Sequence, residues 1–593
     1  MKPFNAYRKR IEVLESEIAL LSGRHNIFSF VRLILFLLSG VSVYLFAVGY
    51  SFFIPLTAIA AFVAILLIDS KLVARLKLKR ALKTLNEDEI ASDKSHSHRI
   101  FSNGSASVDP KHPYSFDIDV FGEGSLFKHI NRTVTPLGEA RLSETLKTVN
   151  KNTDEIKARQ ASVGELAENT ELRHGFIVEK YLNPHVPEDD VNKLLESDEL
   201  LTINSENIIY RVLLILFPLI FILSVVLASA EKVSNNLPFM MFILQLAIVG
   251  NYVKRINGYH RIIDSISKNL KRDARLLKTI EKYTFRSELI ANLKRELIEK
   301  EGSALSAIKQ SELLLNAFEN RMNMVVSFLL NGVYMRDLWL ILRFNRWLKK
   351  YKNEVPLWMA HIAEFDELIS IANFNFNNPD FIFPDSEGTW FLKSEELGHP
   401  LIDAEKRVCN NFTITSTGEL HIVTGANMSG KSTFLRTALI NLVLASSGSA
   451  VCAKKFSYKP ASIFSSIRTF DNLIDDVSYF QAELIRLKQM MEEAAKGEPV
   501  VIAIDEPLKG TNSEDKRKGS ILLLGKMVQL PVCGLVATHD LELKVLAEND
   551  KRFHLICFEL RFEGEKVIYD YTLREGVTTT MNATILMKNM GLI

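Results

Sequence analysis

Hydrophobic and polar positions along this chain form two distinct patterns, and the first consists of long runs without charge. Residues 33–68 carry no charged side chain, and residues 212–253 are uncharged except around a short polar segment at 231–236. A helix needs about 20 apolar residues to cross a bilayer. Each run therefore has room for two crossings, and the pattern predicts four transmembrane helices arranged as two hairpins. We expect the spans at 32–49, 52–68, 212–230 and 237–253.

Basic residues flank both predicted hairpins. They are Arg8, Lys9, Arg10, Arg24, Arg32, Lys71, Arg75, Lys77, Lys79, Arg80, Arg211, Lys254 and Arg255. Loops with an excess of Lys and Arg stay on the cytoplasmic side. The sequence therefore predicts a protein integral to the cytoplasmic (inner) membrane, with both termini and every large segment in the cytoplasm.

The second pattern covers the rest of the chain. Apolar residues at three- and four-residue spacings predict helices over 114–211 and over much of 254–397. From 398 to 593, short β-rich runs such as PVVIAIDE alternate with helical segments, which is typical of a mostly parallel sheet. We expect 1–31 to form a cytoplasmic N-terminal helix, and the Ser-rich stretch within 69–113 indicates a linker.

Composition excludes little. The 72 Lys and Arg nearly balance the 70 Asp and Glu, so overall charge gives no reason to expect a polyanionic partner. Four cysteines without metal-like spacing indicate small buried side chains in a reducing compartment.

One short segment carries candidate chemistry. Residues 425–432 fit G-x-x-x-x-G-K-[ST], after a predicted strand and before a predicted helix, which is the context of a P-loop. Backbone N–H groups would surround the phosphates of ATP, Lys431 would neutralise the β- and γ-phosphates, and Ser432 would hold Mg²⁺. The predicted nucleotide-binding residues are Gly425, Ala426, Asn427, Met428, Ser429, Gly430, Lys431, Ser432 and Thr433.

Two later strands supply the groups that ATP hydrolysis needs. The buried run at 499–504 delivers Asp505, a predicted Mg²⁺ ligand, and Glu506, which would orient or deprotonate the attacking water. The next strand delivers His539, placed to sense the γ-phosphate. We therefore predict an ATPase whose catalytic residues are Lys431, Glu506 and His539.

Two families place such parts in this order. ABC-type transporter ATPases carry a Leu-Ser-Gly-Gly-Gln-like run ahead of the Asp-Glu strand, and this chain has DNLIDDVSYFQAEL at 471–484 instead. That run resembles the corresponding loop of the MutS family of DNA mismatch repair ATPases. The cradle at 424–433 and the segments at 505–513, 537–539, 399–402, 124–138, 156–163 and 364–372 also resemble MutS motifs.

The resemblance implies a MutS-like core domain at 114–211, lever helices at 254–397 and a MutS-type ATPase domain at 398–593. It implies a dimer, most simply of two identical subunits, in which Ser478 reaches the partner's γ-phosphate. It also implies ATP and Mg²⁺ as cofactors.

The sequence departs from the family pattern in three places. No mismatch-recognition or connector domain precedes the core motifs, a predicted membrane hairpin interrupts the core region, and Val408 stands where family members often stack an aromatic ring on adenine. We therefore expect a membrane-anchored ATPase in which ATP opens and closes a dimer. DNA binding is expected from the resemblance, whereas mismatch-specific binding is not. The alternatives are a membrane mechanoenzyme acting on a protein or lipid without DNA, and an ABC-type transporter.

Overall fold

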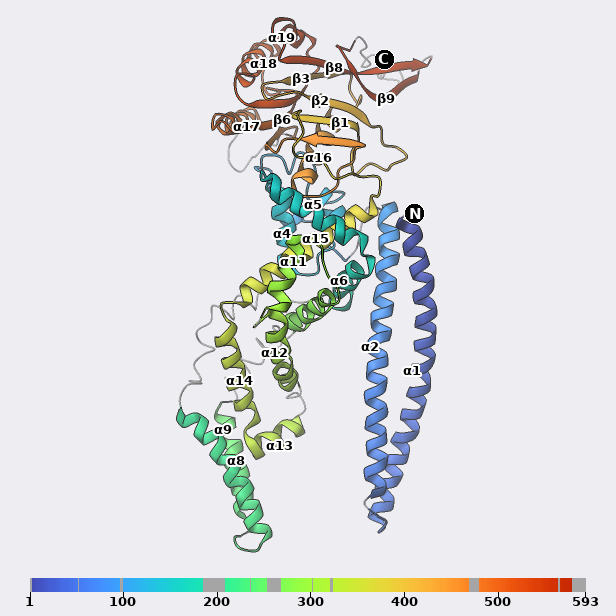
Figure 1. Cartoon of the computed structure of the whole chain (residues 1–593), viewed down its shortest axis with the longest axis vertical. Coiled ribbons are helices and arrows are strands. Elements are labelled where there is room, and N and C mark those ends of the chain that lie inside the picture. Colours follow the sequence, from blue (N-terminus) through green and yellow to red (C-terminus); the bar gives the residue numbers. More distant parts are fainter. Residues whose placement is uncertain are drawn as a thin grey trace. The chain divides into compact units, whose positions relative to one another are not determined.

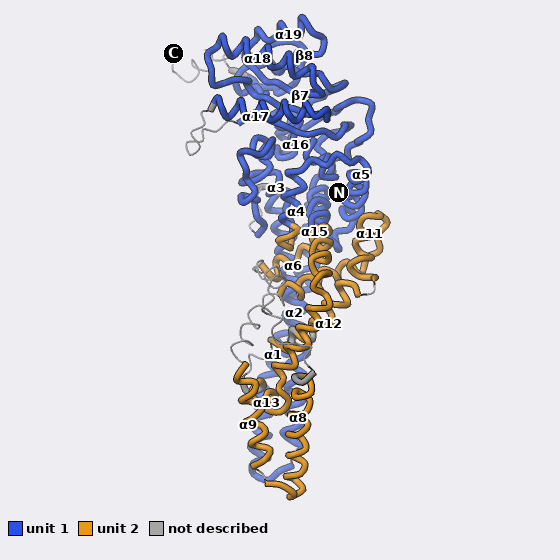
Figure 2. The backbone as a smooth tube through the Cα atoms, turned by 90° about the vertical axis from the view of Figure 1, so that its left-hand side faces the viewer, with its two compact units in different colours: residues 1–133, 139–173, 367–593 blue, residues 134–138, 174–366 orange. Residues whose placement is uncertain are grey.

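The computed structural model describes residues 3–51, 53–95, 100–184, 208–234, 236–252, 268–300, 302–319, 324–468, 479–563 and 566–578. The chain divides into two compact units (Figure 2). Unit 1 comprises residues 1–133, 139–173 and 367–593, and unit 2 comprises residues 134–138 and 174–366.

Unit 1 begins with two long helices, α1 (Pro3–Ala47) and α2 (Phe53–Ser95), which pack side by side (Figure 1). The chain turns between the first two expected spans, at Gly49, whose φ of 103° suits glycine. Ion pairs join the two helices at their polar ends, including Lys79 to Glu17 at 2.6 Å. The expected N-terminal helix and first span form one helix, and α2 continues well into the segment expected to be a linker.

A buried polar cluster attaches this hairpin to the helical part of unit 1. Glu89 of α2 accepts hydrogen bonds from Arg132 Nε at 2.7 Å, Asn373 Nδ2 at 3.1 Å and Asn377 Nδ2 at 2.9 Å. Tyr7 of α1 donates to Asn377 at 2.6 Å. Because Glu89 and Arg132 are almost fully buried, each depends on these partners to offset its lost hydration.

Residues 126–182 form four shorter helices. They are α3 (Leu126–Ile130), α4 (Pro136–Lys147), α5 (Thr153–Glu168) and α6 (Thr170–Leu182). The last helix before the sheets, α15 (Val355–Asn377), belongs to unit 2 up to Asp366 and to unit 1 from Glu367.

The C-terminal part of unit 1 holds two sheets. The larger has the order β5-β6-β7-β3-β8-β9, and its strands are parallel except β9, which runs antiparallel to β8. The smaller is antiparallel with the order β2-β1-β4. The strands are β1 (Leu392–Leu397), β2 (Asn410–Ile414), β3 (Leu420–Gly425), β4 (Lys455–Tyr458), β5 (Ser462–Ser466), β6 (Val500–Asp505), β7 (Val532–Ala537), β8 (Phe553–Glu563) and β9 (Lys566–Glu575).

Apolar runs explain the larger sheet. Strands β3, β6 and β7 are buried almost throughout, as expected for parallel strands covered on both faces. One face packs in a single core with the helices α17 (Tyr479–Ala494), α18 (Ser513–Met527) and α19 (Lys544–Asn549). The helix α16 (Lys431–Ser446) also packs against β3, β6 and β7. The prediction of a mixed helical and α/β protein with a mostly parallel sheet is confirmed.

Unit 2 is helical. Besides a helical stretch at 268–281, it contains α8 (Ile208–Ser229), α9 (Asn236–Asn251), α11 (Glu288–Lys294), a π-helical turn (Arg295–Glu299), α12 (Ala304–Glu319), α13 (Met324–Tyr334) and α14 (Arg336–Tyr351). The apolar helix α13 packs against α8 and α9, and the rings of Phe328 and Phe242 lie 5.4 Å apart.

The prediction of four membrane-length helices is wrong for the described residues, which contain three. These are α1, α2 and the stretch Arg211–Ser229 within α8. The fourth apolar helix, α9, has 16 residues. At 1.5 Å per residue it measures about 24 Å, which is less than the roughly 30 Å of a bilayer's hydrocarbon core.

Candidate functional site

The segment between β3 and α16 has the conformation of a tight loop. Gly425 and Gly430 have φ of 156° and 106°, and Met428 adopts a φ of 64°. A side chain at Gly425 is also excluded by space, because a Cβ there would lie 2.6 Å from Ser429 Oγ and 2.9 Å from the carbonyl oxygen of Phe558. The glycines of the motif therefore let the loop fold closely over the end of β3.

Lys431, the first residue of α16, is 5% exposed, and its side chain turns back under this loop. Its Nζ donates to the carbonyl oxygens of Gly425 and Ala426, both at 2.9 Å, and lies 3.3 Å from Nε2 of His539. Burial lowers the pKa of the Lys431 ammonium, and the carboxylates of Asp505 and Glu506 oppose that shift. The side chain is thus held in one place beside two acids.

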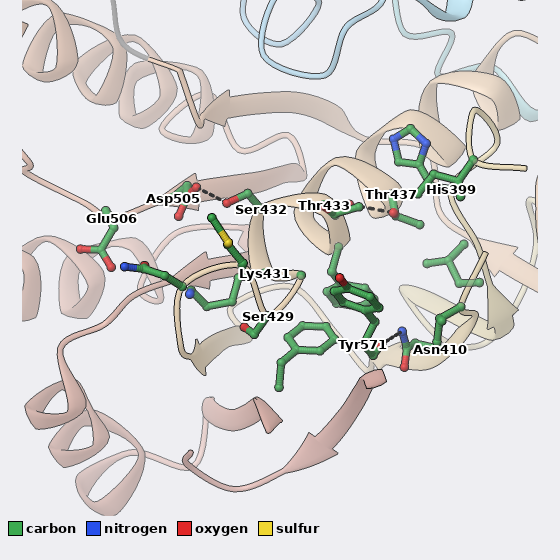
Figure 3. A pocket seen from close by; sticks show the side chains of 18 of the residues that line it. His399, Asn410, Ser429, Lys431, Ser432, Thr433, Thr437, Asp505, Glu506 and Tyr571 are labelled. Atoms are coloured by element: carbon green, nitrogen blue, oxygen red, sulfur yellow. Dashed lines mark hydrogen bonds between the residues drawn. The ribbon is translucent and has the colours of Figure 1, made fainter. Parts of the chain in front are cut away.

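Ser432 and Asp505 meet at the start of α16 and the end of β6. The Ser432 hydroxyl donates to Asp505 Oδ2 at 2.6 Å (Figure 3). A hydroxyl and a carboxylate are hard oxygen ligands of the kind that Mg²⁺ prefers. Both residues predicted as metal ligands therefore lie together and offer a donor set that fits Mg²⁺.

Glu506 follows Asp505 with a φ of 58°, which is unusual for a residue other than glycine. Its Oε1 accepts a hydrogen bond from the backbone N–H of His539, and its Oε2 pairs with Nζ of Lys516 on α18 at 2.5 Å. Burial lowers the pKa of the His539 imidazole, and the Lys431 ammonium lowers it further. Adjacent ends of β6 and β7 thus place Glu506 and His539 beside Lys431.

The side chains of Lys431, Ser432, Asp505, Glu506 and His539 line one pocket of about 600 Å³. Figure 3 shows Asp505 and Glu506 on one side of the loop, and Tyr571, Asn410 and His399 on the other. Burial lowers the pKa of His399 to about 4, so its imidazole is neutral at pH 7. Asn410 fixes β9 beside the loop, since its Nδ2 donates to the carbonyl of Tyr571 at 3.0 Å and its Oδ1 accepts from Leu573 N at 2.7 Å.

The sequence did not reveal several residues of this pocket and its surroundings. Tyr571 lies in β9 with no motif around it, and Lys516 is one of several charged residues in the first half of α18. Val408, which replaces the expected aromatic residue, does line the pocket, together with the aromatic Tyr571.

Glu483 supports the site from behind. It is 2% exposed and accepts hydrogen bonds from the backbone N–H groups of Leu508 at 2.7 Å and Lys509 at 3.2 Å. A Cβ at Gly510 would lie 2.7 Å from Cβ of Phe480. The start of α17, which carries Phe480 and Glu483, therefore packs against the loop that follows Asp505 and Glu506 and shapes it.

The structure brings together most of the predicted site. Asn427, Met428, Ser429, Gly430, Lys431, Ser432, Thr433, Asp505, Glu506 and His539 all line the pocket, and Gly425 and Ala426 provide the carbonyl groups that hold Lys431. Ser478, predicted to act on a partner subunit, lies outside the described residues.

Comparison with known families shows which family the sequence matches. The model of MutS domain III matches residues 112–372, and that of MutS domain V matches residues 421–589. The chain belongs to the MutS family.

Individual relatives match over parts of their length. The chain is 29% identical over 256 residues to the DNA mismatch repair protein MSH3 of Vanderwaltozyma polyspora, covering 40% of this chain and 24% of that protein. It is 30% identical over 231 residues to the human MutS protein homolog 4, covering 37% and 24%. It is 24% identical over 510 residues to the DNA mismatch repair protein MutS of Persephonella marina, covering 79% and 57%. The chain thus spans between about a quarter and just over half of the length of these relatives.

Proposed function

We propose that this protein is a Mg²⁺-dependent ATPase of the MutS type. The observation that carries the proposal is the convergence of Lys431, Ser432, Asp505, Glu506 and His539 on one pocket at the carboxyl ends of β3, β6 and β7. Ligands of open parallel sheets bind at that edge.

The roles follow from the chemistry of each group. Lys431 Nζ is the ammonium available to the β- and γ-phosphates, and the backbone N–H groups at the start of α16 add positive potential. Ser432 and Asp505 hold Mg²⁺, which supplies neutralisation of phosphate charge. Glu506 orients or deprotonates the attacking water, and His539 contacts the γ-phosphate.

Dimerisation completes the site in this proposal. The family resemblance assigns Ser478 to the γ-phosphate of a partner subunit, so two copies of the chain would enclose two nucleotides. Since the γ-phosphate is present only before hydrolysis, ATP binding closes the dimer and hydrolysis releases it.

We also propose that the chain is anchored in a membrane, with the ATPase part on the cytoplasmic side. Support comes from α1, α2 and α8, in which large apolar side chains face outward instead of packing inside the protein. Examples with about half or more of their surface exposed are Leu33, Phe36, Leu37, Leu67, Ile215 and Leu219. Such surface is unfavourable in water and suits lipid.

The macromolecule on which the ATPase acts is proposed to be DNA, because two of the relatives described above are named as DNA mismatch repair proteins. A second candidate is a membrane mechanoenzyme that acts on a lipid or protein partner without DNA. The observation in its favour is that the helical unit 2 itself carries the apolar group α8, α9 and α13.

ATP turnover by the detergent-purified full chain tests the activity. Lys431→Ala should abolish turnover, whereas the control Lys454→Ala, which removes an exposed lysine outside the pocket, should not. Turnover that persists in Lys431→Ala would refute the proposed site.

The same assay separates the two candidates for the partner. Matched, mismatched and branched DNA should stimulate turnover, and the stimulation should fade with salt because phosphate contacts release counterions. Stimulation by anionic vesicles together with indifference to every DNA would favour the membrane mechanoenzyme.

A further inference from the structure

Among the residues that the structure describes, Glu419, His421 and His554 form a cluster outside the nucleotide pocket. His421 belongs to β3 and His554 to β8, and the two residues are direct neighbours in the parallel pairing of these strands. Glu419 lies two residues before His421. Since side chains alternate along a strand, Glu419 and His421 share one face of the sheet.

His421 is buried without a polar partner. It is 7% exposed, and neither ring nitrogen has a hydrogen-bond partner among the described residues. Its ring packs edge-on against Phe412 at 5.0 Å and stacks on His554 at 4.7 Å. A buried polar group that makes no hydrogen bond destabilises the folded state, so the arrangement calls for a ligand.

The three side chains offer a suitable set of ligand atoms. One atom from each lies within 4.8 Å of the others. Ligands around a tetrahedral zinc ion at about 2.0–2.2 Å stand roughly 3.3 Å apart. The exposed His554 has room to rotate by the difference, while the neighbours of His421 fix its position. The Glu419 carboxylate is held by hydrogen bonds that it accepts from Thr415 N at 2.7 Å and from Ser416 Oγ at 3.1 Å, and each of its oxygens keeps a second lone pair for a metal.

We propose that Glu419, His421 and His554 bind a zinc ion that joins β3 to β8. Two imidazole nitrogens and one carboxylate suit Zn²⁺, whereas Mg²⁺ and Ca²⁺ prefer oxygen ligands alone.

The position gives the ion a structural role. The cluster lies at the amino end of β3, and the loop around Gly425 lies at its carboxyl end. The site is therefore separate from the Ser432 and Asp505 pair, and zinc binding does not depend on the proposed ATPase activity. Three protein ligands leave the fourth zinc position for water.

Bound metal in the untagged full chain in detergent tests the proposal. The protein is stripped with a chelator, equilibrated with ZnCl₂ in excess MgCl₂, and analysed by mass spectrometry of the elements. We expect about one zinc ion per chain and a rise in the midpoint of thermal unfolding when zinc is added.

Variants at the two accessible ligands locate the ion without disturbing the core. His554→Gln and Glu419→Gln should each weaken zinc binding at least about tenfold and reduce the thermal shift, whereas the control His361→Gln should bind zinc like the wild type. Absence of zinc from the wild type would overturn the proposal. Equal zinc binding by His554→Gln, Glu419→Gln and the wild type would also overturn it, since the ion would then lie elsewhere.

Discussion

The hydroxyl of Ser432 donates a 2.6 Å hydrogen bond to the carboxylate of Asp505. This bond joins the first turn of α16 to the end of β6, and its two residues lie 73 positions apart in the chain. Both side chains are therefore positioned before any nucleotide binds, which limits the entropy lost on assembling the site.

The first prediction concerns this pair. Ser432→Ala and Asp505→Asn should each raise the Mg²⁺ concentration for half-maximal ATP turnover at least about tenfold, because each removes a ligand oxygen or its charge. Ser432→Thr keeps the hydroxyl and should restore most of the affinity. Titration of turnover with MgCl₂ at saturating ATP measures the effect. A Mg²⁺ requirement unchanged in both Ser432→Ala and Asp505→Asn would contradict the assignment.

The second prediction concerns Lys516. Its ammonium holds Glu506 Oε2 in an ion pair on the side away from the backbone N–H of His539. We predict that this pair restrains Glu506 in the isolated subunit, so Lys516→Ala should raise basal ATP turnover by about 2–5-fold, which corresponds to roughly 0.4–1 kcal/mol of barrier. Lys516→Arg retains the charge and serves as the matched control. A loss of turnover in Lys516→Ala would instead make this lysine a supporting residue of the active site.

The third prediction concerns Tyr571. This residue lies on the opposite side of the loop from Asp505 and Glu506, and a Cβ at Gly430 would lie 3.1 Å from its ring. An aromatic wall there should contact the base of the nucleotide. Tyr571→Ala should raise KM for ATP by about fivefold, roughly 1 kcal/mol, with little change in kcat, and Tyr571→Phe should behave like the wild type. Equal KM values in Tyr571→Ala and the wild type would place the base elsewhere.

The sequence identified the residues that meet in the candidate site better than it identified the residues around them, and the reason is physical. Lys431, Ser432, Asp505 and Glu506 occupy fixed offsets from buried strands, and parallel strands bring their carboxyl ends to one edge of a sheet. Tyr571 has no such offset. Its place depends on the antiparallel pairing of β9 with β8 and on the hydrogen bonds of Asn410, which are long-range contacts.

The long apolar helices illustrate the opposite limit. The sequence placed the turn between the first two expected spans well, because Gly49, Tyr50 and Ser51 can form a tight turn inside a run that is uncharged throughout. Hydropathy did not reveal that α2 continues to Ser95, since the charged residues from Asp69 onward end the apolar run and not the helix. Counting uncharged runs also predicted a span at 237–253, although that run has only 17 residues and the helix α9 has 16, fewer than the roughly 20 needed to cross a bilayer.

The last prediction concerns the pH dependence of stability and rests on Asp366 in unit 2. Its carboxylate accepts hydrogen bonds from Val134 N, Thr135 N and Thr135 Oγ1, the last two at 2.7 Å. Glycine is required at position 138, since a Cβ there would lie 2.3 Å from Asp366 Oδ2. Burial raises the pKa of Asp366 from 3.8 to about 6, although these hydrogen bonds oppose the shift.

A raised pKa means that the folded state binds the proton more tightly than the unfolded state does. Protonated Asp366 therefore stabilises the folded state fully below about pH 4, and this stabilisation is lost as the pH rises through about 6. Well above pH 6, Asp366 no longer makes the free energy of unfolding depend on pH. Between pH 5 and pH 7 this loss amounts to about 1 kcal/mol, or roughly 1–2 °C in the unfolding midpoint. Asp366→Asn should be less stable throughout but should lack this step, and the exposed Asp380→Asn should retain it. Thermal unfolding followed by tryptophan fluorescence at both pH values measures the difference, and an equal pH dependence in Asp366→Asn and the wild type would show that Asp366 does not titrate in this range.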